Sequence, residues 1–395
     1  MVTLLLLLMA GCSDDNDPGQ SSALTDRSSF MMYIYLPNGS STRSEDYSRT
    51  IYIDKPFERT INSLRVWIFA RNSSKELIPI SDDDGAVNGA LYVNVGSIDT
   101  SVDMKDLAFD VEAGFNNRYP YVDIYVVANI ESLGEGITDN WNTWCSPKNT
   151  ESLQDMENRI ESLQLDANTF GVGSMVSDAS TTGLPMSGYI KEAEVQTQGV
   201  VYTTMNIKVL RAVSKLRFVF AKSPTTPEAA ITSVKLNAGM IPTTEYLFSG
   251  TADANGVKLP ATGNSYGSTY NSSEIDFGAP ASIKTNVMPS RLNWSASTNR
   301  QDWEDAMNAA ISNNEATEHV RAYLHESDKR LIGTIKYKLT TDGAEKSATF
   351  QMSESPSGQF LRNSSWTVYA YFTEGGLVYE VANWDEQEVT YKPFI

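Results

Sequence analysis

The side chains that most often carry enzyme chemistry are scarce and scattered in this sequence. Two histidines are present, His319 and His325. On one continuous strand they would lie about 20 Å apart, too far to share a metal ion or a proton. Cys145 stands in the segment WNTWCSPKN without a nearby histidine, so we expect an idle thiol and not a nucleophile. A Gly-x-x-x-x-Gly-Lys phosphate loop is absent from the sequence.

Acidic residues give no clearer sign of a catalytic or metal site. Asp82, Asp83 and Asp84 precede Gly85, as at the start of a calcium loop, but the twelfth position is Val93 where an EF-hand needs Glu. We therefore expect a solvated turn there. Carboxylate pairs for glycoside hydrolysis are defined by spacing in the fold, and nothing singles out a pair among the 49 acids. The sequence predicts no enzyme, no catalytic residue, no metal and no cofactor.

Length and composition indicate a globular protein of two domains. The chain has 395 residues, more than one hydrophobic core usually serves, and 41% of them are hydrophobic. The net charge of −18 argues against nucleic acid as a partner, because phosphate binding needs a basic face. The simplest explanation of this negative charge is that it keeps the protein soluble. With two cysteines, the chain has no disulfide framework.

The first residues resemble a bacterial lipoprotein signal. The apolar run VTLLLLLM, residues 2–9, is too short to span a bilayer and is followed by Ala-Gly and Cys12. We predict a signal peptide over residues 1–11, a lipid such as palmitate on Cys12, and a flexible acidic tether over residues 12–28. The acidic run resembles the surface-export signal of Bacteroidales lipoproteins, with an ordinary solvated tether as the alternative. No Lys or Arg precedes the apolar run, which leaves the true start codon open.

The rest of the chain is predicted to be mainly β, with two β-sandwich domains in tandem. Short apolar runs alternate with Gly, Asn, Asp and Ser clusters. Asp342-Gly343 between two such runs is a hairpin signal. The clearest strands are residues 64–70, 90–96, 121–130, 214–221, 332–340 and 365–372.

Two helices and a polar stretch complete this organisation. Residues 298–311 open with a capping box and repeat apolar residues at helical spacing, and residues 151–163 show the same spacing after Pro147. The chain turns polar and rich in Gly, Ser and Thr between residues 165 and 205. We therefore place the domain boundary near residue 200, between an N-terminal sandwich over residues 29–200 and a C-terminal one over residues 201–395.

The segment FMMYIYL begins the first predicted domain and has the pattern of a buried strand. Its alternate residues are apolar and would share one face: Phe30, Met32, Ile34 and Leu36. The residues that follow, PNGSSTRSEDYSR, are small, polar and rich in turn formers, so this linker should be exposed and easily cut.

Several segments taken together resemble the Bacteroidales fimbrillin family, the lipoprotein-derived subunits of type V pili. Each segment alone is weak, but their order along nearly the whole chain matches the family. They are INSLRVWIFARNSSKELI (61–78), VDIYVVANI (122–130), LPMSG (184–188), VLRAVSKLRFVF (209–220), IPTTEYLF (241–248), LRNSSWTVYAYF (361–372) and VANWDE (381–386).

The resemblance implies two sandwiches of transthyretin-like topology and a specific maturation. In polymerising members, a trypsin-like protease cuts after an arginine in the loop that follows the first strand, and a strand of the next subunit fills the groove. Carried over here, the lost strand is residues 30–36 and the cut follows Arg43, with Arg49 as second choice. Cleavage at Arg27 would leave the strand in place.

The family also implies a donor strand near the C-terminus. In shaft subunits the C-terminal segment fills the neighbour's groove, which points here to residues 377–395. Candidate anchors are Val378, Val389, Tyr391 and Phe394. Pro393 can sit only where no N–H is needed, and the sequence stops 11 residues after Trp384. A donor shortened in this way would suit a tip or accessory subunit, which receives a strand but does not donate one.

These expectations favour a structural subunit of a cell-surface fimbria with a role in adhesion. Its partners would be other fimbrial subunits, the outer membrane through the lipid on Cys12, and a host or bacterial surface ligand. The alternatives are a tip or anchor subunit that does not polymerise, and a lipid-anchored protein that binds glycans through Trp141 and Trp144. The processing protease, the adhesion ligand and the removal of the first strand stay open.

Overall fold

The computed structural model describes most of the chain from Arg27 onward. Its described residues are 27–36, 56–99, 104–133, 140–165, 183–198, 201–248, 251–252, 258–259, 268–286, 300–352, 360, 362–383 and 392–393. The predicted signal peptide, Cys12, Arg43 and Arg49 lie outside these residues, as do Val389, Tyr391 and Phe394. In the described part of the chain, no helix is long and apolar enough to cross a membrane.

Two sheets form the N-terminal half. The β1 sheet has the order β5-β1-β9-β8, and the β2 sheet has the order β10-β7-β6-β2-β3, with β4 also paired to β2. Their strands are β1 (Arg27–Tyr35), β2 (Leu64–Arg71), β3 (Leu77–Ile78), β4 (Leu91–Asn94), β5 (Met104–Glu112), β6 (Tyr121–Ala128), β7 (Met186–Glu194), β8 (Thr197–Gln198), β9 (Val201–Lys208) and β10 (Leu210–Arg211).

Two further sheets form the C-terminal half. The β11 sheet has the order β16-β11-β20-β21-β22, with β17 also paired to β11, and the β12 sheet has the order β15-β12-β18-β19. Strands β13 and β14 make a separate ladder. The strands are β11 (Ser214–Lys222), β12 (Ala230–Leu236), β13 (Thr251–Ala252), β14 (Lys258–Leu259), β15 (Ile275–Asp276), β16 (Lys284–Thr285), β17 (Thr317–Leu324), β18 (Ile332–Lys338), β19 (Lys346–Gln351), β20 (Ser365–Thr373), β21 (Gly376–Asn383) and β22 (Lys392–Pro393).

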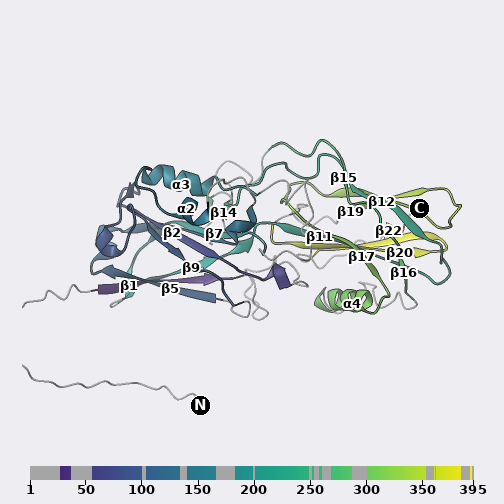
Figure 1. Cartoon of the computed structure of the whole chain (residues 1–395), viewed down its shortest axis with the longest axis horizontal. Coiled ribbons are helices and arrows are strands. Elements are labelled where there is room, and N and C mark those ends of the chain that lie inside the picture. Colours follow the sequence, from purple (N-terminus) through teal and green to yellow (C-terminus); the bar gives the residue numbers. More distant parts are fainter. Residues whose placement is uncertain are drawn as a thin grey trace, which may run out of the picture.

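Each pair of sheets encloses one hydrophobic core, and the two halves follow one another along the long axis of the molecule (Figure 1). Alternation along the strands builds these cores, because side chains at every second position face the opposite sheet. In β12, for example, Ile231, Val234 and Leu236 are buried, with a bulge between the first two. The prediction of a mainly β fold made of sandwiches is confirmed.

Helices cover the outer faces of two sheets. α3 (Leu153–Glu161) packs Met156 and Ile160 on the β2 sheet, and α4 (Arg300–Ser312) packs Trp303 and Met307 on the β11 sheet (Figure 1). Both predicted helices are present, although α3 starts only after its cap Ser152, whose hydroxyl accepts from the Asp155 N–H. The shorter helices are α1 (Phe115–Arg118) and α2 (Trp141–Cys145).

The change from one sandwich to the other comes later than residue 200. β9 pairs with β1, and β10 pairs with β7, so both strands belong to N-terminal sheets. β11, which starts at Ser214, is the first strand of the C-terminal half. We therefore propose the domain boundary at residues 212–213. The polar stretch that suggested residue 200 contains β7 and β8 and overlaps the start of β9, so it lies within the first sandwich and not between the two.

Candidate functional site

β1 is an internal strand whose neighbours depend on it. It pairs antiparallel with β5, from Arg27 opposite Glu112 to Tyr35 opposite Met104, and parallel with β9 on its other side. Among the described strands, β5 pairs with β1 alone. Withdrawal of β1 would therefore leave the backbone groups of β5 and most of β9 without a ladder partner, which makes the sheet open to another strand.

The alternate side chains of β1 are buried as predicted. Phe30, Met32 and Ile34 are 0% exposed and Leu36 is 3% exposed, whereas the residues between them are half-buried. All four pack in the core between the β1 and β2 sheets. Their burial contributes about 6 to 12 kcal/mol before the cost of ordering the strand. Any strand that replaced β1 would have to fill the same four positions.

One of these positions is an aromatic pocket around Phe30. The Phe30 ring centroid lies 6.4 Å from that of Phe109 in an edge-to-face arrangement and 5.7 Å from that of Phe115 in a tilted one. Phe115 in turn contacts Tyr119 at 4.8 Å. Such pairs stabilise by about 0.5 to 1.5 kcal/mol beyond simple burial. The pocket therefore prefers an aromatic ring to an aliphatic side chain.

Arg27 fixes the start of β1 to an acidic edge. Its Nε donates to Asp110 Oδ1 at 3.0 Å, Nη2 donates to the Asp110 carbonyl at 2.9 Å, and Nη1 donates to the Asp83 carbonyl at 3.0 Å. The hydrogen bond to the Asp110 carboxylate raises the pKa of Arg27. The bond between Arg27 and Ser28 lies inside the ladder with β5, so a protease would have to open the sheet to bind it.

The edge that faces Arg27 is built by the turn at residues 82–84. Asp84 is 1% exposed, and its carboxylate accepts from Arg118 Nη2 at 2.8 Å and from the Glu112 N–H at 2.9 Å. The expectation of a solvated turn is therefore wrong for Asp84, whereas Asp82 and Asp83 are exposed. The buried carboxylate holds this turn against β5, which is why the Asp83 carbonyl can reach Arg27.

The chain beyond the linker is fixed at the junction of the two sandwiches. The 3₁₀ turn η1 (Pro56–Glu58) starts directly after the undescribed residues 37–55. Phe57 is buried, and its ring lies edge-to-face to Tyr323 of β17 with centroids 5.5 Å apart. This contact joins the chain just after the linker to the C-terminal half, so η1 is part of the core and not of the linker.

A buried ion pair secures η1 further. The Glu58 carboxylate accepts from Lys215 Nζ at 3.0 Å and from the Tyr323 hydroxyl, and the Glu58 carbonyl accepts from Arg211 Nε at 2.8 Å. Glu58, Lys215 and Arg211 are all at most 1% exposed. Burial lowers the pKa of Arg211 to about 10. A cut between residues 37 and 55 would therefore free β1 and its upstream segment while the chain from Pro56 stays anchored.

The predicted donor segment is described only in part. Val378 lies in β21, opposite Tyr371 of β20 and Pro393 of β22. The pairing of β22 with β21 spans two residues, Lys392 and Pro393, and β22 is the outermost strand in the sheet order, a place where proline is tolerated. Val378 is thus in a paired strand of its own sandwich, while the other candidate anchors lie outside the described residues.

The tryptophans proposed as a glycan platform are packed into the protein. Trp141 and Trp144 of α2 lie edge-to-face, with ring centroids 5.6 Å apart. Both are half-buried against the apolar side chains that α3 and the outer face of the β2 sheet share. The Arg159 guanidinium lies 4.5 Å from the centre of the Trp144 ring. One face of the Trp144 ring is therefore already covered by a cation.

In the described part of the chain, the cysteine and the histidines that could serve as a nucleophile or a base are Cys145, His319 and His325. Cys145 is buried, and this raises the pKa of its thiol to about 12. His325 is buried, with Nδ1 2.9 Å from the Pro242 carbonyl, and burial lowers the pKa of His319.

A Gly-x-Ser-x-Gly pattern, which can mark a catalytic serine, stands at residues 263–267, outside the described residues. A nucleophile elbow requires a helix directly after the serine, whereas the next element here is strand β15.

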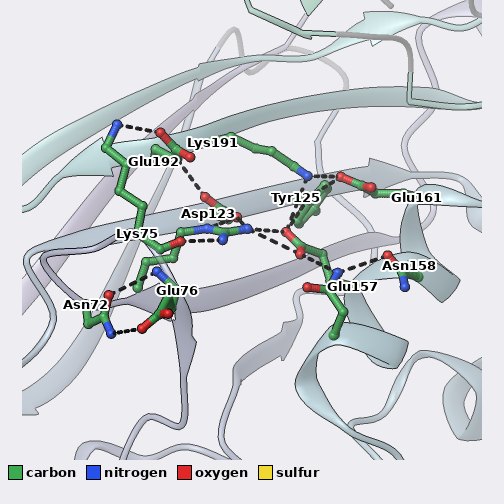
Figure 2. Close-up of polar contacts among 12 residues, drawn as sticks. Asn72, Lys75, Glu76, Asp123, Tyr125, Glu157, Asn158, Glu161, Lys191 and Glu192 are labelled. Carbon is green, nitrogen blue, oxygen red and sulfur yellow. Dashed lines mark hydrogen bonds and ion pairs between the residues drawn. The ribbon is translucent and has the colours of Figure 1, made fainter. Parts of the chain in front are cut away.

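The densest polar network lies between α3 and the β2 sheet (Figure 2). Arg71 donates to Asp123 at 2.7 Å and to Glu157 at 3.2 Å. The Tyr125 hydroxyl oxygen lies 2.8 Å from a Glu157 oxygen and 2.6 Å from a Glu161 oxygen, and its single proton can be donated to one of the two at a time. Burial raises the pKa of Glu157 and that of Tyr125.

Its charges are matched inside the network. Lys191 pairs with Glu161, and Lys75 pairs with Glu192 at 2.5 Å. The Asp123 carboxylate also accepts from the Glu192 N–H at 2.6 Å. Because each acid meets a cation or an N–H donor, we interpret the network as a clamp that holds α3 on the sheet.

Sequence reasoning found the strand but missed what surrounds it. Arg27 was considered only as a cleavage site, although it anchors the strand, and the ring pocket of Phe109 and Phe115 was not recognised. An alternation of apolar residues in KDLAFDVE marks β5 as a strand, which was the available signal. The role of Glu58 had no local signal, because its partners are more than 150 residues away.

Comparisons with known proteins find similar solved structures but no similar sequence. No model of a known family matches the chain, and no curated protein sequence matches it. Among solved structures, the tip fimbrial protein Mfa3 of Porphyromonas gingivalis, with a C-terminal truncation, is similar over 90% of this chain and 99% of its own, at 12% identity and a TM-score of 0.45.

Two further solved structures are similar over most of the chain. A fimbrial assembly protein of Parabacteroides distasonis matches over 93% of this chain and 100% of its own, at 12% identity and a TM-score of 0.42. The fimbrial anchor protein Mfa2 of Porphyromonas gingivalis matches over 92% and 100%, at 9% identity and a TM-score of 0.37. The identities are low and the superpositions loose, so we infer the function of this chain from its own strand and groove.

Proposed function

We propose that this chain is a structural subunit of a cell-surface fimbria that assembles by strand exchange and serves adhesion. It would reach the outer membrane as a lipoprotein carrying lipid on Cys12. A cut after Arg43, or after Arg49 as second choice, would release β1 together with the lipid. A strand of another subunit would then fill the groove, supplied in a shaft arrangement by a C-terminal segment with anchors such as Val389, Tyr391 and Phe394.

The position of β1 is the observation that carries this proposal. It is the first described strand, it is internal to its sheet, and it is the sole ladder partner of β5 among the described strands. Its only covalent connection to the rest of the fold runs through residues 37–55. One backbone cut detaches a strand so placed from the rest of the chain, and its replacement by another strand then uses both a backbone ladder and an apolar groove.

The fixed position of η1 supports the same scheme. The chain after the linker enters the junction of the two sandwiches, where Phe57 and Glu58 are buried. Cleavage in the linker therefore would not loosen the body of the subunit. A new strand in the groove would regain the same apolar burial and ladder hydrogen bonds, which would make the assembly stable without covalent links between subunits.

Limited trypsin treatment tests the cleavage step. We expect the first cut after Arg43, with Ser44 as the new N-terminus by sequencing, followed by SDS-resistant ladders on gels. The Arg43→Gln variant should lose that product or shift the cut to Arg49. The matched control Arg27→Gln should cut as the unchanged protein does, because Arg27 lies in a paired strand.

The outcome separates the versions of the proposal. A protein that is fully cut after Arg43 but keeps β1 bound and stays monomeric would contradict a shaft subunit and favour a tip or anchor subunit that retains its strand. A protein whose linker resists trypsin while loops elsewhere are cut would contradict processing in the linker altogether.

A further inference from the structure

We propose that the β1 groove selects its occupant by two features at one end, an aromatic ring and a cation three residues before it. The partner it fits is an extended strand of a different protein chain, with the pattern cation-x-x-aromatic followed by apolar residues at every second position. This inference rests on the proposed function, because the groove must be vacated before another strand can enter.

The aromatic requirement comes from the pocket of Phe30. Two phenylalanines, Phe109 of β5 and Phe115 of α1, contact its ring at angles typical of favourable aromatic pairs. Both belong to the part of the protein that would remain after β1 left. A smaller side chain there would leave a cavity between rings that are held by the surrounding core.

The cation requirement comes from the acidic edge beside Arg27. The Asp110 carboxylate, the Asp110 carbonyl and the Asp83 carbonyl converge on one guanidinium, and Glu112 lies directly opposite Arg27 in the ladder. All these acceptors come from β5 and the turn before it. Without a cation they would face one another, and an incoming acid would add a further negative charge.

The chain's own C-terminal segment does not fit this pattern. With Tyr391 in the aromatic pocket and the strand running as β1 does, the residue three positions earlier is Glu388. With Val389 in the pocket, the corresponding residue is Glu386. With Phe394 in the pocket, the corresponding residue is the uncharged Tyr391. The first two alignments bring a carboxylate to Asp110, and none of the three brings a cation. A second copy of this chain can still enter the vacated groove, but the groove holds it more weakly than a subunit with Lys or Arg at that position.

Peptide exchange in the full protein tests this selection. A site for a specific protease is placed within residues 44–49, the purified chain is cut and unfolded, the N-terminal fragment is removed, and the remainder is refolded with a labelled peptide. The four peptides are residues 27–36, the same peptide with Phe30→Ala, the same peptide with Arg27→Glu, and residues 386–395. Dissociation into excess unlabelled peptide gives the rate of release.

We expect the unchanged peptide to be held longest. Loss of the ring should speed release by at least ~100-fold, from the usual cost of Phe→Ala in a core. Reversal of the charge should speed it about fivefold, because the ion pair is exposed. Residues 386–395 should be released faster than the unchanged peptide. Asp110→Lys in the protein should remove the disadvantage of the Arg27→Glu peptide and impose one on the unchanged peptide.

The outcomes separate this inference from the function on which it rests. Equal retention of the four peptides would overturn the selection while leaving strand exchange intact. Retention of the Arg27→Glu peptide unaffected by Asp110→Lys would overturn the charge requirement. If not even the unchanged peptide is retained by a refolded protein, the groove does not accept a separate strand, and both the proposed function and the selection fail.

Discussion

Replacing Ile34 by Asp is expected to expel β1 once the linker is cut. Ile34 is 0% exposed in the core between the β1 and β2 sheets, so a carboxyl group there loses its hydration and gains no partner. We expect the free energy of unfolding of the N-terminal half to fall by at least ~4 kcal/mol, which is at the upper end for one substitution. Urea unfolding measures the loss in the uncut protein.

The same variant links stability to strand release. After specific cleavage within residues 37–55, the unchanged protein should retain β1 until a competing strand is added, whereas the Ile34→Asp protein should release it unaided. Size-exclusion chromatography followed by mass spectrometry detects the freed fragment. Met31→Asp is the matched control, because Met31 lies on the half-buried face of the same strand and its replacement should change stability far less. Retention of the Ile34→Asp strand after cutting would contradict the idea that burial alone holds β1.

The strands whose pattern is local were the predictable part of the fold. Predicted strands over residues 64–70, 121–130 and 214–221 match β2, β6 and β11, whose buried runs are nearly continuous because both faces of their sheets are covered. The hairpin at Asp342-Gly343 joins β18 to β19 in an antiparallel ladder, but its turn is longer than two residues. The spacing of apolar residues and the identity of turn residues are sufficient to predict such strands and hairpins from the sequence.

Long-range pairing was not predictable from the sequence. β1 and β9 are parallel neighbours although more than 160 residues separate them, and no local pattern encodes that choice. The same distance explains the displaced domain boundary, since a change of composition near residue 200 says nothing about the partners of β9 and β10. At the candidate site, alternation gave the four buried residues of β1, whereas the ring pocket and the acidic edge come from β5 and turns that only the fold brings to them.

Breaking the ion pair at the junction of the sandwiches should also lower the free energy of unfolding strongly. Lys215→Met removes a cation that faces the Glu58 carboxylate, which is 0% exposed and lies in a place that water does not reach. Breaking one partner of a buried pair is strongly destabilising, and we expect a loss of about 3 kcal/mol in the free energy of unfolding. Tryptophan fluorescence during urea unfolding provides the measurement.

The double variant Glu58→Gln with Lys215→Met distinguishes a lost charge partner from lost packing. The Glu58→Gln side chain would carry no charge and could still accept from the Tyr323 hydroxyl, so the double variant should recover part of the stability that Lys215→Met loses. Recovery is partial because the buried Arg211 also loses the Glu58 countercharge. Equal losses in the single and double variants would mean that the aliphatic stem of Lys215, and not its charge, holds η1. Recovery would instead show that charge pairing fixes the end of the linker, which is what allows a cut before Pro56 to release β1 without disturbing the two sandwiches.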